Sequence, residues 1–302
     1  MFYLIVAILC SSSIAIIFRF SETRKMNRLG VTSFNYLGAV IVSALLLVLN
    51  PPALVGRGEN FFKELPSVLT NTHQVFEGIN SVYWAVLVGI PAGLFFFLAF
   101  VFYQKSIHHG SISLAGAFSK LGILVPMTMA IILWREFPTT VQWTGVFLAL
   151  IAIIIIYKPF GVSLNKEKLL PLALLFVFGG VAEFSNKIFQ HYSVSGYRSV
   201  FLFSVFSSAF VISSSVLIIS RKRFGQREVL TGLILGIPNL FSSFFLIMAL
   251  ESMKSSVAFP LYSAGSVALI AIWGVLFFSE KLERSEVLAV TLILFSLVLV
   301  NL

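Results

Sequence analysis

The sequence predicts an all-α polytopic membrane protein with ten transmembrane helices, arranged as two inverted five-helix repeats. Three observations support this fold class. Hydrophobic residues make up 58% of the chain and charged residues only 11%, whereas about a quarter of a soluble domain is charged. Apolar runs long enough to cross a hydrocarbon core of about 30 Å as helices recur along the chain. Short motifs in the first half also return in the second.

Ten spans are predicted from the apolar runs. They cover residues 2–18, 32–49, 83–103, 111–134, 139–157, 169–191, 199–220, 229–250, 255–278 and 286–302. Several runs carry Phe, Leu, Ile and Val on every face, which indicates contact with lipid or other helices all round. The only long connection, residues 50–82, contains several Pro and Gly residues and is predicted as a loop with room for a short surface helix.

The net charge of +9 indicates membrane topology rather than a nucleic-acid partner. The basic residues gather in short loops between apolar runs, as in loops that face the cytoplasm. The single cysteine, Cys10, lies inside the first run, so no intrachain disulfide can form.

Two motifs define the repeats as residues 1–157, with spans one to five and the loop 50–82, and residues 158–302, with spans six to ten. Gly89-Ile90-Pro91 in the third span matches Gly236-Ile237-Pro238 in the eighth. Trp134-Arg135-Glu136 at the end of the fourth span matches Phe278-Ser279-Glu280 at the end of the ninth. Because five is odd, consecutive copies cross in opposite senses, which is the inverted repeat of many secondary transporters.

With these motifs, nearly the whole chain resembles the drug/metabolite transporter superfamily, specifically its ten-span EamA-type members. The most specific marker is an apolar span, a Glu, a short turn and another span, seen at Arg135-Glu136-Phe137-Pro138 and at Ser279-Glu280-Lys281-Leu282. Each half is also similar to a small multidrug resistance protein. The resemblance implies transport of small molecules through a cavity between the two repeats.

Apart from Glu286, the first residue of the last span, three side chains inside the predicted spans are charged: Lys120, Glu183 and Lys187. A charge at mid-membrane costs at least about 2.5 kcal/mol, so each is a functional candidate with an expected partner. Glu183 and Lys187 are one helical turn apart and can form an ion pair. Alternatively, Lys187 reaches outward to the interface and leaves Glu183 partly desolvated and able to exchange a proton. Both readings of Glu183, proton coupling and structural pairing, stay open.

The resemblance adds a role for Glu183. Ala182-Glu183-Phe184 falls where small multidrug resistance proteins carry an essential first-helix glutamate, whereas the first half has Ser11 or Ser12 there. One acid provides at most one proton site, which is a departure from the two-glutamate arrangement of those dimers.

Lys120 is predicted to face the cavity, because it lies too deep in the fourth span to reach the interface. It suits a substrate carboxylate or phosphate, and the alternative is a pair with Glu183. The resemblance places Tyr262 where small multidrug resistance proteins have a cavity tryptophan, with Phe118 as its counterpart in the first half. Aromatic faces there can stack on a ligand.

Asn186 and Asn239 complete the predicted substrate-binding residues. Their amide groups need hydrogen-bond partners inside the helix bundle.

Motifs for enzymatic chemistry are absent from the sequence. It has no phosphate-binding loop, no zinc-ligand cluster and no Gly-x-Ser-x-Gly elbow. We therefore expect no ATP hydrolysis, no metal, no cofactor and no catalytic residue. The energy for any transport is expected to come from a gradient, from exchange or from a partner.

The predicted function is secondary transport of a small polar metabolite, an amino acid or an organic anion or zwitterion, by proton coupling or exchange. The alternatives are an exporter of organic cations or drugs that uses Glu183, a non-transport membrane subunit, and a lipid-modifying enzyme. The expected partners are the small-molecule substrate, protons and the lipid bilayer, with no nucleic acid. We expect a monomer or homodimer in the plasma or inner membrane.

The orientation of the chain is a first testable prediction. Loops after odd-numbered spans hold most basic residues: Arg19, Arg24, Lys25, Arg28, Lys158, Lys166, Lys168, Arg221, Lys222, Arg223 and Arg227. The positive-inside rule then places both termini outside, whereas the resemblance implies cytoplasmic termini. A C-terminal phosphatase that folds only outside the cytoplasm is expected to be active. A fluorescent C-terminal reporter that matures only in the cytoplasm would show the opposite orientation.

Overall fold

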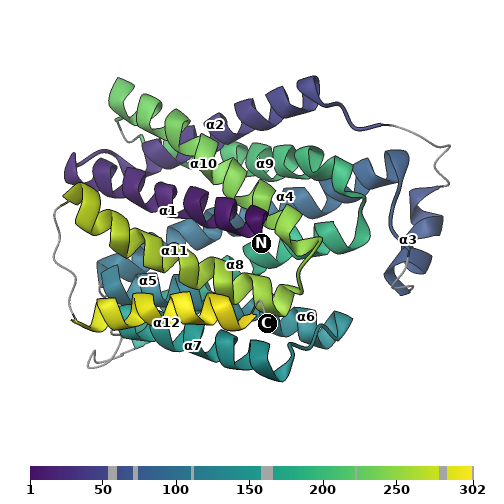
Figure 1. The fold of residues 1–302 in the computed structure, drawn as a ribbon. Coiled ribbons are helices and arrows are strands. Elements are labelled where there is room, and N and C mark those ends of the chain that lie inside the picture. Colours follow the sequence, from purple (N-terminus) through teal and green to yellow (C-terminus); the bar gives the residue numbers. More distant parts are fainter. Residues whose placement is uncertain are drawn as a thin grey trace. The chain divides into compact units, whose positions relative to one another are not determined.

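The structure, a computed structural model, describes residues 1–53, 60–70, 74–109, 112–157, 166–221, 223–278 and 284–300 as an array of helices (Figure 1). The helices are α1 (Phe2–Thr23), α2 (Arg28–Leu49), α3 (Phe61–Thr70), α4 (Gly78–His109), α5 (Ile112–Leu121), α6 (Leu124–Trp134), α7 (Thr140–Tyr157), α8 (Lys166–Tyr192), the 3-10 turn η1 (Ser195–Tyr197), α9 (Arg198–Ile219), α10 (Gln226–Leu250), α11 (Ser255–Phe278) and α12 (Arg284–Val300).

Membrane-spanning helices dominate the described residues. Seven of them are long and apolar enough to cross a bilayer: α1, α2, α4, α8, α9, α10 and α11. Three shorter apolar stretches, Phe118–Trp134, Thr140–Ile155 and Val287–Ser296, cover the remaining predicted spans. The prediction of an all-α polytopic membrane protein is confirmed.

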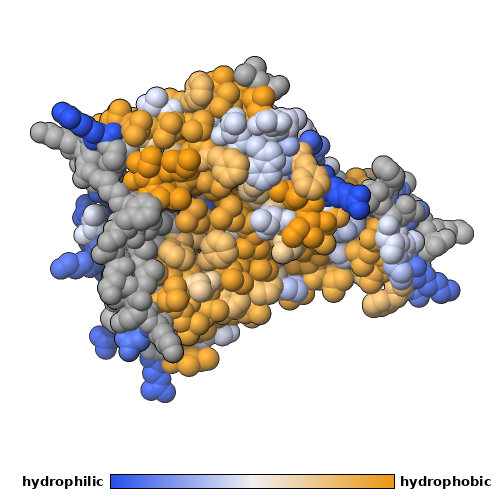
Figure 2. Space-filling view, turned by 90° about the horizontal axis from the view of Figure 1, so that it is seen from below, coloured by the Kyte–Doolittle hydropathy of each residue, from blue (hydrophilic) through white to orange (hydrophobic). Residues whose placement is uncertain are grey.

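Hydrophobic side chains cover the flanks of the helices on the face that Figure 2 shows, and hydrophilic side chains lie toward helix ends. On α2, Leu45 and Val48 are 54% and 77% exposed, and on α12 Phe295 is 56% exposed. Large apolar side chains exposed along helix after helix are the pattern of a surface that faces lipid.

Two of the differences from the sequence prediction concern the third and fourth spans. The fourth span, expected as one helix over 111–134, is broken into α5 and α6 between Leu121 and Leu124. The third span starts at Gly78 rather than 83, because α4 continues into the end of the predicted loop. The short surface helix expected in that loop is α3.

The chain divides into two compact units that differ from its sequence halves. One unit holds residues 1–12, 98–184 and 252–302, and the other holds residues 13–97 and 185–251. Both units therefore draw on both predicted repeats, and α1, α4 and α8 each pass from one unit into the other.

Helices at matching positions of the two predicted repeats pack together. In the first unit α7 packs on α12 and α6 on α11; in the second α2 packs on α9. These are spans five and ten, four and nine, and two and seven. Such pairing is what a two-fold relation between repeats would produce, and the superposition of 1–157 on 158–302 stays a prediction.

The Gly-Ile-Pro motif makes close helix contacts in both repeats. A Cβ on Gly89 of α4 would lie 2.7 Å from Cβ of Ser204 on α9, and one on Gly236 of α10 would lie 2.5 Å from N of Ala39 on α2. Each glycine thus lets its helix approach a neighbour to backbone contact, as small residues do between membrane helices. Both contacts belong to the second unit.

Small side chains also fill the core of the first unit. Its fully or almost fully buried members come from α7, α11 and α12: Ala149, Ala152, Ile153, Ala264, Val267, Ala268, Ala289 and Ile293. Small residues allow three helices to pack closely without a hydrophobic driving force from water.

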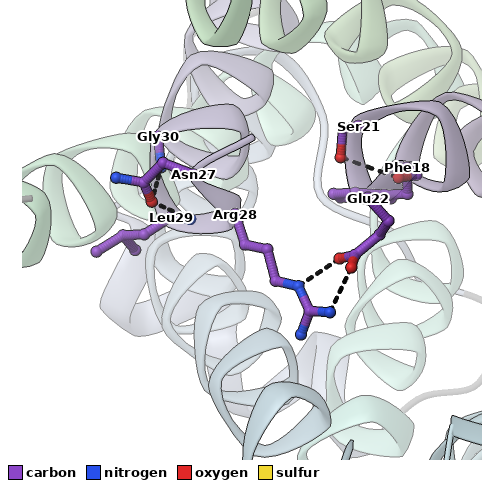
Figure 3. A network of polar contacts seen from close by, with 7 residues as sticks. All are labelled: Phe18, Ser21, Glu22, Asn27, Arg28, Leu29 and Gly30. Atoms are coloured by element: carbon purple, nitrogen blue, oxygen red, sulfur yellow. Dashed lines mark hydrogen bonds and ion pairs between the residues drawn. The ribbon is translucent and has the colours of Figure 1, made fainter. Parts of the chain in front are cut away.

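A polar network fixes the turn between α1 and α2 in the second unit (Figure 3). The side chain of Asn27 caps α2 by accepting hydrogen bonds from the N–H groups of Leu29, at 3.1 Å, and Gly30, at 3.3 Å. Glu22 at the end of α1 pairs with Arg28 at the start of α2. The reversal of the chain therefore rests on local caps and one exposed ion pair.

Candidate functional site

Pro126 contributes to the break between α5 and α6. In a continuous helix the N–H of residue 126 would bond to the carbonyl of Gly122, but proline has no N–H. The Gly122 carbonyl instead accepts the N–H of Val125, three residues on, at 3.0 Å. The helix tightens there, and α6 begins afresh at Leu124.

Helix α8 packs against this break with almost no side chain between the backbones. A Cβ on Gly180 would lie 2.5 Å from both the Gly122 carbonyl oxygen and Cβ of Val125. One on Gly122 would lie 3.0 Å from the Phe176 carbonyl oxygen. Irregular backbone inside a membrane is tolerated where protein buries it, and α8 provides that cover.

Lys120 lies in the last turn of α5, directly before the break, with a half-buried side chain. Glu183 lies on α8, one turn after Gly180. The helix that covers the break therefore carries an acid close in sequence to the packed glycine. Both expected roles of Lys120, contact with a substrate anion and pairing with Glu183, stay predictions.

Helix α11 forms another side of the Lys120 environment. Ser263 Oγ donates a hydrogen bond to the Lys120 carbonyl at 3.1 Å, a contact that the sequence gave no reason to expect. The neighbouring Tyr262 is buried. Phe118, half-buried on α5, precedes Lys120 by two residues. Lys120, Phe118, Glu183 and Tyr262 all belong to the first unit.

Ser12, one of the two first-half residues at the position matching Glu183, has a structural role. Its side chain is fully buried, donates to the Leu9 carbonyl at 2.9 Å and accepts the indole N–H of Trp273 on α11 at 3.1 Å. The two positions that the resemblance matches therefore differ. Ser12 joins α1 to α11, whereas Glu183 carries a charge.

Glu136, the glutamate of the first repeat's marker, caps α11. Its carboxylate accepts the N–H of Ser255 at 2.6 Å, and its carbonyl accepts the hydroxyl of Ser256 at 2.5 Å. An acid at a helix N-terminus meets unsatisfied N–H groups and the positive end of the helix dipole. The matching segment of the second repeat, Ser279-Glu280-Lys281-Leu282, lies outside the described residues.

Comparison with known proteins identifies the second half of the chain. Residues 166–302 match the family model of the EamA-like transporter family. The matched segment is similar to that family and includes Glu183, Tyr262 and Ser263, so three of the residues around Lys120 come from it. The match confirms the resemblance inferred from the Glu-and-turn marker for this half, and the helices are those of a multi-pass membrane protein.

Two further proteins are similar over almost the whole chain. An uncharacterized protein of Haemophilus influenzae is 26% identical over 286 residues, which are 93% of this chain and 91% of that protein. A protein of known crystal structure superposes with a TM-score of 0.74 at 17% identity, covering 100% of this chain and 97% of that one. This second likeness supports the fold alone.

Lys187 and Asn186 lie on the part of α8 that belongs to the second unit. Lys187 is only 3% exposed and donates a hydrogen bond to Gln190 Oε1 at 3.0 Å. The suggestion that Lys187 reaches out to the interface is therefore wrong, because an amide one turn on holds its ammonium inside. Asn186, the residue before Lys187, is also buried, at 1% exposure.

Asn239 is joined to another asparagine in the second unit. Its side-chain amide donates to Oδ1 of Asn35 on α2 at 3.2 Å. A hydrogen bond between two membrane helices is a common means of holding them together. Asn239 therefore belongs to the α2–α10 contact of the second unit.

Sequence reasoning missed Arg198, which begins α9. Its Nε donates to the Ser195 carbonyl at 2.8 Å, one terminal nitrogen lies 3.7 Å from Glu251, and its guanidinium lies over the ring of Phe244. Arg198 stands one residue before the predicted span 199–220, so a search for charges inside spans passes over it. The sequence did hold one signal for this contact, because Glu251 is the polar residue that follows the Gly-Ile-Pro motif and the apolar stretch of the eighth span.

Two adjacent glycines test the packing of α8 on the break. Gly180→Ala should lower the melting temperature by the equivalent of about 1–3 kcal/mol, because its methyl group overlaps the backbone of Gly122. Gly179→Ala is the matched control, since no atom lies within 4 Å of its Cβ position. Thermal unfolding of both purified variants in detergent measures the difference, and equal melting temperatures would contradict the contact.

Proposed function

We propose that this protein is a secondary transporter of a small polar metabolite that carries a carboxylate or another anionic group. The observation that carries the proposal is the position of Lys120 at the end of a broken helix, with Glu183 on the helix that covers the break. Discontinuous helices form substrate and ion sites in many transporters with repeated folds. Tyr262 and Phe118 of the same unit supply aromatic surface for the rest of the substrate.

Proton coupling follows because Glu183 and the substrate anion compete for the positive charge of Lys120. When Glu183 is ionised it balances the lysine charge, and an anionic substrate gains little by approaching. When Glu183 takes up a proton, the ammonium of Lys120 is left to attract the substrate anion. Because such coupling is reciprocal, bound anion favours protonation of Glu183 by the same free energy, typically about 1–3 kcal/mol. Proton and anion then travel in the same direction, or the substrate is exchanged.

The alternatives are less well supported. An exporter of organic cations through Glu183 would have to bring its cargo beside Lys120, whose charge repels it. A membrane subunit or lipid-modifying enzyme is disfavoured by the transporter family of residues 166–302. We place the protein in the plasma or inner membrane, as a monomer or homodimer, with the substrate passing through a cavity lined by both repeats.

Replacing Glu183 by Gln is expected to separate coupling from binding. Glutamine keeps the shape and most hydrogen bonding of protonated Glu183 but cannot release a proton. Uptake into proteoliposomes driven by a pH gradient should disappear, whereas exchange of substrate at equal pH should continue. A panel of radiolabelled amino acids and organic acids supplies the substrate.

The control for this variant is Glu167→Gln, an acid exposed in the first turn of the same helix. It should keep pH-driven uptake. The coupling role is refuted if Glu183→Gln vesicles still accumulate substrate in response to a pH gradient.

Replacing Lys120 by Met should weaken substrate binding, because the charge that attracts the anion is removed while the aliphatic length is kept. We expect a loss of about 2–5 kcal/mol in binding free energy, as for one partner of a buried charge pair. Lys105→Met, an exposed lysine on α4, is the control and should bind normally. Ligand-induced shifts in melting temperature report the binding.

A purely structural Lys120–Glu183 pair predicts a different pattern. Each single change would then lower stability, and a double change to Met and Leu would restore it, as can happen with buried ion pairs. Transport recovered in the double variant would reject the substrate and coupling roles together.

A further inference from the structure

The short helix α3, in the long connection between α2 and α4, has three distinct faces. Phe61 and Val68, seven residues apart, are 9% and 1% exposed and form its inner face. Phe62, Pro66 and Leu69, spaced by four and three residues, are exposed and form a second apolar stripe. A third stripe, Lys63, Ser67 and Thr70, is polar and exposed. We use the name outer stripe for Phe62, Pro66 and Leu69.

The inner face holds α3 firmly on the second unit. The Phe61 ring lies 5.2 Å from that of Phe76 and 5.8 Å from that of Tyr83 on α4. Phe76 is itself fixed, because its N–H donates to the Tyr192 carbonyl at 2.9 Å. The side-chain amide of Asn80 on α4 donates to Glu64. With one face docked in this way, the outer stripe has a defined direction.

The outer stripe continues a surface that faces lipid. Tyr83, which the ring of Phe61 touches, is 52% exposed and stands on an apolar stripe of α4 together with Ile79, Leu87 and Ile90. Figure 1 shows α3 beside the start of α4, with its axis turned across that of α4. Tyrosines at this position in membrane helices mark the boundary between hydrocarbon and water.

We propose that α3 is an interfacial helix, with its outer stripe inserted among lipid headgroups and upper acyl chains. Its three faces then meet three environments: protein at Phe61 and Val68, lipid at the outer stripe, and water at Lys63, Ser67 and Thr70. A helix that lies in the interface needs an apolar face beside a polar one, and α3 has both next to its docked face. Phe62, 78% exposed in the protein, is covered by the bilayer.

Fluorescence quenching in proteoliposomes tests this placement on the full-length chain. With the single cysteine, Cys10, replaced by Ala, an environment-sensitive probe is attached at Phe62→Cys or Leu69→Cys. Lys63→Cys and Ser67→Cys are the matched controls on the polar stripe of the same helix. Each sample is titrated with aqueous iodide and, separately, with phospholipid that carries a nitroxide near its headgroup.

Probes at 62 and 69 should show blue-shifted emission, strong quenching by the nitroxide lipid and weak quenching by iodide. Probes at 63 and 67 should show the reverse. Iodide quenching of equal strength at all four positions would place α3 in water and overturn the proposal. Protection of 62 and 69 from both quenchers would also overturn it, because another protein or a second copy of the chain would then cover the stripe.

Discussion

The absence of water from the bilayer core is the constraint on which the rest of this structure depends. Each backbone N–H and C=O in the hydrocarbon region must find its partner within the protein, so helices are the default and any break must be covered. The chain has such a break at Gly122, where Pro126 withholds an N–H, and Gly180 allows α8 to cover it at backbone distance. That cover brings Glu183, one turn further along α8, to the end of α5.

The same constraint makes the charges at the break informative. A lone lysine in this environment would be costly, and attraction to a carboxylate at low effective dielectric lowers the cost. A static bundle could avoid it altogether with two apolar residues. Retaining Lys120 and Glu183 is consistent with the proposed transport cycle, in which a proton or an anionic substrate would change the balance between the two charges.

The sequence predicted the features that depend on length and composition. Hydropathy located the seven helices of membrane length and the three shorter apolar stretches, because crossing the bilayer requires a long apolar run. Motif spacing pointed to the EamA-like half. The break in the fourth span was missed, because Pro126 is compatible with either a kink or a break, and packing on Gly180 decides between them. The environment of Lys187 was mispredicted for a related reason. Its position within the span could be estimated from the sequence, but its hydrogen-bond partner Gln190 was not identified.

The two positions that the resemblance makes equivalent show what joining two repeats in one chain allows. Two identical halves would carry the same residue twice, hence two acids or none. Here Ser12 accepts the Trp273 N–H and stabilises helix packing, while Glu183 carries a charge. The residue that matches Lys120 five spans on is Ala264, judged from the alignment of Phe118-Ser119 with Tyr262-Ser263. Ala264 is fully buried in the small-residue core. By this alignment, neither Lys120 nor Glu183 has a charged counterpart at the matching position of the other repeat.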